Sequence, residues 1–288
     1  MLDIRIGGVP EHFNLPWHLA IEDGLYAAYD LRLQWQNYGG GTGAMVRDLQ
    51  DNKLDAAVLL TEGAVADIIK GGNHRILSLY VESPLVWGIH VHNESQHQHA
   101  SQLEGATFAI SRYGSGSHLM AVVDHQLRGW ATQNLKFETV GNIEGAREAL
   151  ANNEADAFMW EKYMTQPLVT GGEWRRVGER PTPWPSFVIC VRNDVMEANP
   201  NLASRLLPPA IKMANQLKNQ PNAAEIIAGR YNLQVEQAAE WLSQVKWIND
   251  RYVPTAMLEE VMEALASLNL IPEEVAVREL CFEQTQLV

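Results

Sequence analysis

A short segment rich in serine and glycine carries the strongest chemical signal in this sequence. Residues 111–117 read Ser-Arg-Tyr-Gly-Ser-Gly-Ser, between an apolar run that ends at Ile110 and a helical pattern that begins near His118. Glycines let a backbone approach a ligand closely, serine hydroxyls donate and accept, and free N–H groups at a helix N-terminus favour anions or polar oxygens. The segment predicts a cradle for a polar ligand, with contacts from Ser111, Arg112, Ser115, Gly116 and Ser117. The alternative is a strand-to-helix turn in which serine only caps the helix.

Acidic and aromatic side chains stand at the ends of two other apolar runs. Glu62 follows the run 56–60, and Trp160 and Glu161 end the run that begins at Ala157. Carboxylates accept hydrogen bonds from N–H donors, and an aromatic face suits a flat or cationic group. We expect all three side chains to contact a ligand. In the alternative interpretation, Glu62 complements a helix dipole and Trp160 covers the core.

Further candidates lie on the loops that follow other apolar runs. A histidine on such a loop could donate or accept near neutral pH, or it could be a surface residue without a role. Arg112 could pair with an acidic group of the ligand or point to solvent. The remaining residues that we expect at the site are His12, Phe13, Gly41, Thr42, Thr61 and Trp184.

Composition and charge exclude several classes of function. The 288 residues carry a formal net charge of −13 and no basic stripe, which argues against a nucleic-acid partner. No apolar run approaches the roughly 20 residues of a membrane span. The histidines at positions 90, 92, 97 and 99 match no metal-ligand spacing, and no nucleophile motif is present. We therefore expect no metal, no cofactor and no catalytic residue. Cys190 and Cys281 allow one disulfide but do not demand it.

Strand and helix patterns alternate along the chain in two series. The first series ends near Val81, the second runs from Pro84 to Trp160, and segments after Pro200 read as amphipathic helices. Such alternation predicts an α/β protein with mostly parallel sheets. Crossings near residues 84 and 187 predict two lobes joined by two strands, namely residues 1–84 with 188–288, and residues 85–187. Ligands of such sheets bind outside the carboxyl ends of the strands, so we expect a hinged cleft lined by the loops above.

Residues 16–26 (Pro-Trp-His-Leu-Ala-Ile-Glu-Asp-Gly-Leu-Tyr) resemble the first-helix signature of type 2 periplasmic-binding-fold proteins of the nitrate, sulfonate, taurine and thiamine-pyrimidine group. Leu54-Asp55-Ala56, Leu103-Glu104-Gly105 and Ala155-Asp156-Ala157 fit the same pattern. The segments 10–13, 61–62, 83–87, 111–117 and 156–161 are most similar to a small branch found in yeasts and bacteria. The resemblance implies the two-lobed fold with a helical C-terminal tail and a small solute between the lobes, which members of the wider family deliver to a transporter. The cysteine-rich motif of the family's fungal pyrimidine-forming enzymes is absent.

The resulting hypothesis is a solute-binding protein, not an enzyme, that closes two lobes around a pyrimidine-, amine- or sulfonate-like ligand, with an ABC permease as a possible partner. A cytoplasmic ligand sensor and an enzyme of pyrimidine or sulfonate metabolism are the alternatives. The chain starts with a strand-like segment and carries no signal peptide. We therefore expect a cytoplasmic protein, or a periplasmic one if a signal has been removed.

Overall fold

The computed structural model describes residues 1–288 and divides into two compact units. Unit 1 comprises Met1–Ser83 and Trp184–Val288, and unit 2 comprises Pro84–Pro183. The first crossing thus lies at 83–84, next to the predicted position. The second lies at 183–184, a few residues before the predicted one. Trp184 is therefore part of unit 1, where its indole makes the contact described below.

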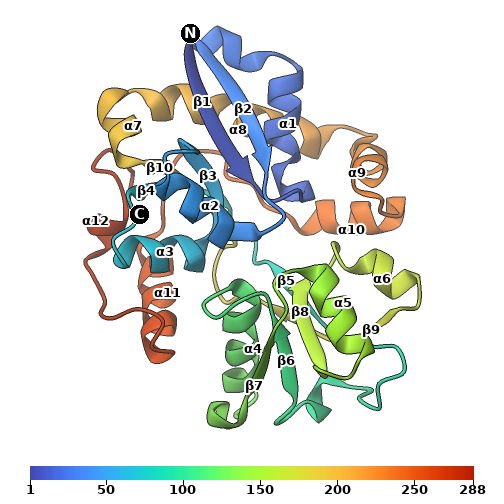
Figure 1. Ribbon diagram of the computed structural model, residues 1–288. Coiled ribbons are helices and arrows are strands. Elements are labelled where there is room, and N and C mark those ends of the chain that lie inside the picture. The colour runs from blue at the N-terminus through green and yellow to red at the C-terminus, as the bar shows by residue number, and fades with distance from the viewer. The chain divides into compact units, whose positions relative to one another are not determined.

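Unit 1 contains one five-stranded mixed sheet, whose strands β1 to β4 are blue to cyan in Figure 1. The strand order is β2-β1-β3-β10-β4, from β1 (Leu2–Gly8), β2 (Leu31–Asn37), β3 (Ala56–Leu60), β4 (His74–Val81) and β10 (Phe187–Arg192). β10 runs antiparallel to both neighbours, and the other four strands share one direction. β3 and β10 are almost wholly apolar and buried, as expected for central strands covered on both faces. Edge strand β2 alternates Leu31 and Leu33 with polar residues.

Helices cover the unit 1 sheet in two groups. α1 packs with the long helix α8, whereas α3 packs with α2 and α11. Pro16 in the first turn of α1 suits a helix start, because its missing N–H would have no partner there. The helices of this unit are α1 (Leu15–Glu22), α2 (Gly41–Gln50), α3 (Thr61–Ile69), α7 (Asn193–Ala198), α8 (Leu202–Asn219), α9 (Ala223–Tyr231), α10 (Val235–Gln244), α11 (Thr255–Ser267) and α12 (Val277–Leu280), with 3-10 turns η1 (His12–Asn14) and η2 (Leu25–Tyr29).

Unit 2 repeats the topology of unit 1. Its order is β7-β6-β8-β5-β9, from β5 (Val86–His92), β6 (Thr107–Ile110), β7 (Lys136–Thr139), β8 (Ala157–Glu161) and β9 (Trp174–Pro181), and only β5 runs against the others. The helices are α4 (Gly116–Leu127), α5 (Ile143–Ala151) and α6 (Gln166–Thr170), with 3-10 turns η3 (Ala100–Gln102) and η4 (Thr132–Asn134). Alternate side chains of β6 and β8 face opposite sides, so Ala109 and Phe158 pack with α5 while Phe108 contacts His125 of α4.

Three details differ from the sequence prediction. Each sheet contains one antiparallel strand, the one that enters the unit after a crossing. β9 and α6 were not predicted, because β9 is an edge strand with charged side chains and the α6 segment is only five residues long. The chain after Pro200 is also not wholly helical: isolated bridges tie Trp247 to Val81, Cys281 to Ile76 and Leu287 to Val253. Both cysteines are free and buried.

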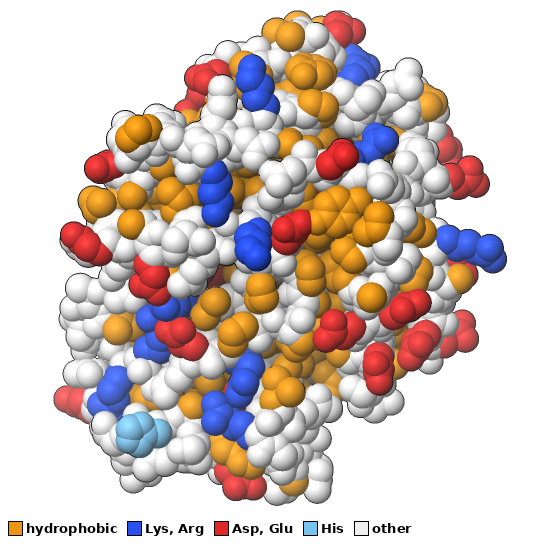
Figure 2. Space-filling model, turned by 180° about the vertical axis from the view of Figure 1, so that it is seen from behind, with side chains coloured by type: hydrophobic (Ala, Val, Ile, Leu, Met, Phe, Trp, Pro, Cys, Tyr) orange, Lys and Arg blue, Asp and Glu red, His pale blue; other side chains and the backbone are white.

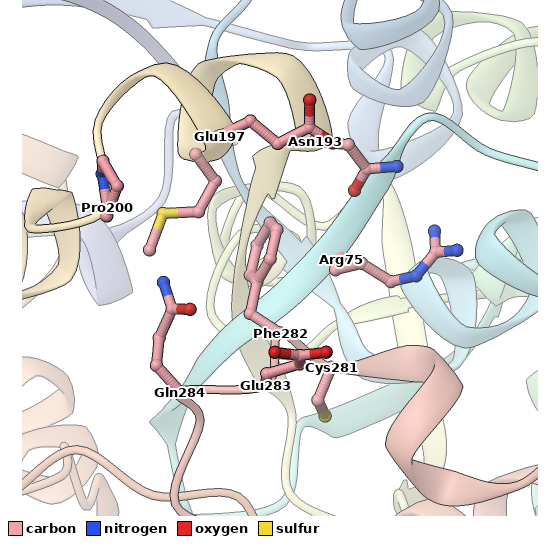
Figure 3. Close-up of a pocket in the computed structure, with 9 residues that line it drawn as sticks. Arg75, Asn193, Glu197, Pro200, Cys281, Phe282, Glu283 and Gln284 are labelled. Carbon is pink, nitrogen blue, oxygen red and sulfur yellow. The ribbon is translucent and has the colours of Figure 1, made fainter.

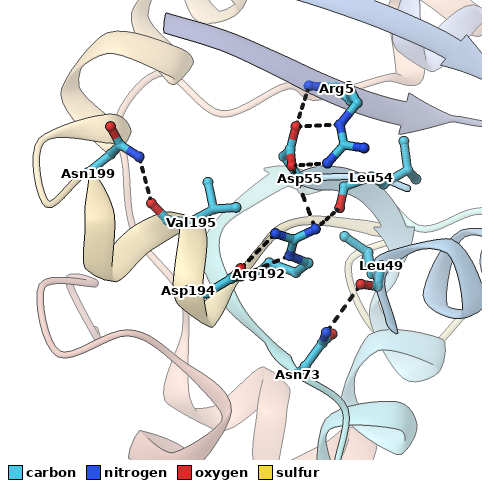
Figure 4. A network of polar contacts seen from close by, with 9 residues as sticks. All are labelled: Arg5, Leu49, Leu54, Asp55, Asn73, Arg192, Asp194, Val195 and Asn199. Atoms are coloured by element: carbon cyan, nitrogen blue, oxygen red, sulfur yellow. Dashed lines mark hydrogen bonds and ion pairs between the residues drawn. The ribbon is translucent and has the colours of Figure 1, made fainter. Parts of the chain in front are cut away.

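The aspartates of the two Asp-Ala motifs have a structural role in this fold. Asp55, at the start of β3, accepts hydrogen bonds from the backbone N–H and the guanidinium of Arg5 at 2.6–2.9 Å. The Arg192 guanidinium lies 3.7 Å from the same carboxylate and donates to Leu54 O, so three segments meet here (Figure 4). In unit 2, Asp156 accepts from the N–H of Thr107 at 2.8 Å. Both carboxylates secure the amino-terminal edge of their sheet's parallel strands, opposite the predicted ligand loops.

Candidate functional site

The carboxyl ends of the parallel strands of unit 1 bring Glu62 and Trp184 together. Glu62 lies in the first turn of α3, directly after β3, and Trp184 precedes β10, which enters the sheet from this edge. Trp184 Nε1 donates to Glu62 Oε2 at 3.0 Å, and both side chains are buried. Nearby, Thr61 donates from Oγ1 to Pro185 O at 2.7 Å and from its N–H to Ser186 O at 3.0 Å. The start of α3 is therefore tied to the returning connection by three hydrogen bonds.

The carboxyl of Glu62 has unused hydrogen-bonding capacity. The residue is 3% exposed, and Oε1 is buried without a hydrogen-bond partner. Burial raises the pKa of Glu62 to about 6, although its own backbone N–H and the Trp184 indole oppose the shift. A buried carboxyl with one free oxygen at a strand end can accept a hydrogen bond from a donor group of a ligand.

Gly41 and Thr42 lie in the first turn of α2 instead of on a loop. Gly41 has φ +63°, which a glycine adopts without strain. Thr42 Oγ1 accepts from the N–H of Leu60 at 3.1 Å. A Cβ on Gly63 would lie 2.6 Å from Thr42 Cγ2, so α2 and α3 approach each other closely here. The threonine hydroxyls at positions 42 and 61 thus hold the edge together.

His12 and Phe13 lie in an aromatic cluster instead of on an exposed loop. The His12 ring centroid is 4.2 Å from that of Trp241, and Phe13 lies 5.1 Å from Phe187. The carbonyl of Phe13 accepts from the Tyr80 hydroxyl and from Trp247 Nε1. Burial lowers the pKa of His12 to about 3, so the imidazole is neutral at physiological pH.

Glu11 is a functional candidate that the sequence reasoning did not select. It follows β1, the neighbour of β3, and is 8% exposed without an ion pair. Burial raises its pKa to about 7. The sequence could have indicated Glu11, because this acidic residue stands directly before the selected His12 in the segment that follows a strand.

The serine segment of unit 2 folds into a turn that satisfies much of its own polarity. Ser115 caps α4 by accepting from the N–H of His118 at 3.3 Å, and its Oγ lies 3.0 Å from that of Ser117. Ser117 Oγ also accepts from the N–H of Ser111 at 3.0 Å. Both hydroxyls are buried and serve the turn, as the alternative interpretation expected. The backbone N–H groups of Gly116 and Ser117 lie in the first turn of α4, where a helix offers its N–H groups no internal acceptor, so they can bind an acceptor of a ligand.

Arg112, Trp160 and Glu161 are the other predicted residues of unit 2. Arg112 is half-buried, and its backbone carbonyl accepts from Ser115 N at 3.1 Å. Trp160 stacks on Phe158 with ring centroids 5.2 Å apart and is only partly exposed. Glu161 Oε2 accepts from the N–H groups of Tyr163 and Met164 at 2.8 and 2.7 Å. This carboxylate therefore stabilises the turn after β8, unlike Glu62, which caps no such turn.

Other features of the structure lie outside these loops. A cavity of about 430 Å³ opens at the amino-terminal edge of the unit 1 sheet, between α7 and the segment around Phe282 (Figure 3). Its wall contains none of the predicted site residues. On the face shown in Figure 2, Lys and Arg are interspersed with Asp and Glu. No group of three or more potential metal ligands is present, and none of the helices combines the length and apolar character that crossing a membrane requires.

The two cysteine thiols do not lie on the candidate loops. Cys190 lies in β10, and Cys281 follows α12. Burial raises the pKa of Cys281 to about 12 and that of Cys190 well above its usual value. A nucleophilic cysteine needs a lowered pKa, so neither thiol is suited to nucleophilic chemistry.

Comparison with solved structures identifies the fold. The chain has the type 2 periplasmic-binding-protein fold seen in sulfonate- and nitrate-binding proteins, which confirms the fold predicted from the sequence. Residues 87–180 match the family model described as Ca3427-like PBP. The search of curated proteins produced no match.

Three solved structures illustrate the likeness. The Candida albicans CA3427 gene product, described as having the generic periplasmic binding protein fold, is 23% identical with a TM-score of 0.89, and the match covers 100% of this chain and 98% of that chain. The alkanesulfonate-binding protein SsuA from Xanthomonas axonopodis pv. citri, bound to MOPS, is 13% identical with a TM-score of 0.81 and 98% coverage of both chains. The nitrate-binding protein NrtA from Synechocystis PCC 6803 is 14% identical with a TM-score of 0.75, covering 96% and 84%.

Proposed function

We propose that this protein is a solute-binding protein that holds a small polar ligand with groups at the strand ends of both units. The observation that carries the proposal is the unused polar capacity at corresponding sheet edges. In unit 1 this is Glu62 Oε1, and in unit 2 it is the N–H pair of Gly116 and Ser117. Open α/β sheets bind ligands at the carboxyl ends of their strands. Binding proteins for an alkanesulfonate and for nitrate share the fold, which supports a binding role.

The connections between the units support a proposal of hinge motion on binding. Within unit 1, Ser186 Oγ donates to Ser83 O at 2.8 Å; within unit 2, Leu85 N donates to Thr182 Oγ1 at 3.0 Å. The two connecting segments are thus hydrogen-bonded to each other once within unit 1 and once within unit 2. A pair of short, mutually bonded connections suits two units that move as rigid bodies around a ligand. Delivery of the ligand to an ABC-type permease is the further role we propose for such a protein.

Native mass spectrometry of freshly purified protein tests the binding role. We expect an added mass in the range of a small metabolite, which is lost on denaturation. Calorimetry with the released compound should give saturable one-site binding, and small-angle scattering should show a smaller radius of gyration in its presence. An absence of any bound molecule, together with no binding by a broad panel of amines, pyrimidines, sulfonates and carboxylates, would contradict the proposal.

A further inference from the structure

The N-terminus of α3 is occupied by a carboxyl of the protein itself. In many proteins a helix N-terminus of this kind holds an anion, because free N–H groups and the helix dipole attract negative charge. Here Glu62 stands in the first turn and is only 3% exposed, with Oε1 unpartnered. A bound anion at this position would face the Glu62 carboxylate without a compensating positive charge.

Two other buried acids of the chain, Asp124 and Asp55, have arginine partners. Asp124, in α4, is 1% exposed, and its carboxylate forms ion pairs with Arg128 at 2.7 Å and with Arg180 at 2.6 Å. Asp55 likewise pairs with Arg5 and lies close to Arg192. Burying a carboxylate costs free energy unless the carboxylate is paired and hydrogen-bonded. Arginine provides that pairing at both sites. Glu62 is in no ion pair, and its indole partner is neutral.

A second unpaired acid lies at the same edge of the sheet. Glu11 follows β1, which pairs directly with β3, and it is buried without an ion pair. Because parallel strands end at one edge, both acids lie at the edge that carries the candidate site. Two buried carboxyls without protein cations at a ligand edge are suited to a ligand that brings the positive charge and the N–H donors.

We infer that the ligand presents a protonated amine or an amidine to Glu62 Oε1. This inference rests on the proposed solute-binding function and narrows the ligand class within it. A simple anion such as nitrate, or a sulfonate without a nitrogen donor, does not satisfy Glu62 and binds weakly.

Matched pairs of probes that differ only in the nitrogen group test the inference. The pairs are benzamidine and benzamide, 4-aminopyrimidine and pyrimidine, 3-aminopropanesulfonate and propane-1-sulfonate, and β-alanine and propanoate. Dissociation constants are measured by calorimetry at low ionic strength for the wild type, for Glu62→Gln and for Glu273→Gln, a control at an exposed glutamate. The glutamine side chain of Glu62→Gln retains an oxygen acceptor for the Trp184 indole but carries no charge. Circular dichroism confirms folding of each variant.

In the pairs that bind, the member with the amine or amidine should bind at least about tenfold more tightly, which corresponds to one charge-assisted hydrogen bond. Glu62→Gln should reduce that preference to within about threefold, whereas Glu273→Gln should leave it unchanged. Equal or stronger binding of the member without the amine or amidine, or a preference that persists in Glu62→Gln, overturns the inference and leaves the binding function standing. Failure of every probe of either kind overturns the inference together with the proposed function.

Discussion

The indole N–H of Trp184 donates a 3.0 Å hydrogen bond to the carboxyl of Glu62, although the two residues are 122 positions apart in the chain. Trp184 is the first residue of unit 1 after the chain returns from unit 2. Glu62 opens α3 at the carboxyl edge of the sheet. The contact therefore links a candidate ligand group to the connection between the units.

The stability of the protein should depend on pH through Glu62. Its pKa is raised by burial to about 6 in the folded protein, above the ordinary value of 4.5. The folded state then holds the proton more tightly than the unfolded state, so this contribution to stability is lost as pH rises from about 4.5 to 6. Relative to the wild type, Glu62→Gln should gain up to about 2 kcal/mol between pH 4.5 and pH 8. Urea unfolding at both pH values measures the difference, and a difference that does not change with pH contradicts the assignment.

Glu62 and Trp184 should be energetically coupled. In a double-mutant cycle of Glu62→Leu and Trp184→Phe, we expect a coupling free energy of about 1–2 kcal/mol, because each single change removes the same buried hydrogen bond. A cycle of Glu62→Leu with Trp17→Phe is the control, since Trp17 is equally buried in unit 1 but makes no hydrogen bond to Glu62. Denaturant unfolding of the variants provides the free energies. Additivity in both cycles would show that the contact does not contribute to stability.

The serine turn of unit 2 should lose stability when Ser117 is replaced. Ser117→Ala leaves the N–H of Ser111 without its acceptor in a partly buried turn, at an expected cost of about 1–3 kcal/mol. Ser115→Ala removes the N-cap of α4 and should cost about 1 kcal/mol. Ser101→Ala, at an exposed serine of the same unit, should change stability by less than about 0.5 kcal/mol. Unfolding of Ser117→Ala that is indistinguishable from that of Ser101→Ala would mean that the turn does not need this hydroxyl.

Asp55 should matter for folding but not directly for ligand binding. Asp55→Asn places an amide where Arg5 Nη2 and Nε now find carboxylate oxygens, so we expect a loss of about 1–3 kcal/mol in unfolding free energy. Asp51→Asn, at an exposed acid that pairs with Lys53, should change it by less than about 1 kcal/mol. Calorimetry of the bound compound should give the same affinity for both variants once folded. Weaker ligand binding by folded Asp55→Asn would contradict this prediction, because it would mean that the amino-terminal edge of the sheet affects binding at the carboxyl edge.

The local sequence pattern was sufficient to predict much of the architecture. Apolar runs such as Ala56–Leu60 and residues 187–191 marked the central strands, because strands covered on both faces need continuous apolar sequence. The repeated series of strands and helices predicted two lobes, and the type 2 periplasmic-binding-protein fold is confirmed. β9 could not be found this way, since the sequence Trp174–Pro181 carries its charges on an edge strand with no apolar alternation.

At the candidate site, the sequence indicated the positions of the polar residues but not their hydrogen-bond partners. Side-chain types and strand ends determined by themselves that Glu62, Glu161 and the serine segment would lie at the carboxyl ends of strands. They did not determine which polar groups the protein would use for itself. Only the tertiary structure decided that the Glu161 carboxylate and the Ser115 and Ser117 hydroxyls bond to nearby backbone or to each other, and that Glu62 retains a free buried oxygen. Hydrogen bonds depend on distances that the path of the whole chain sets, and the Glu62–Trp184 contact forms only because the chain leaves unit 1 and returns beside α3.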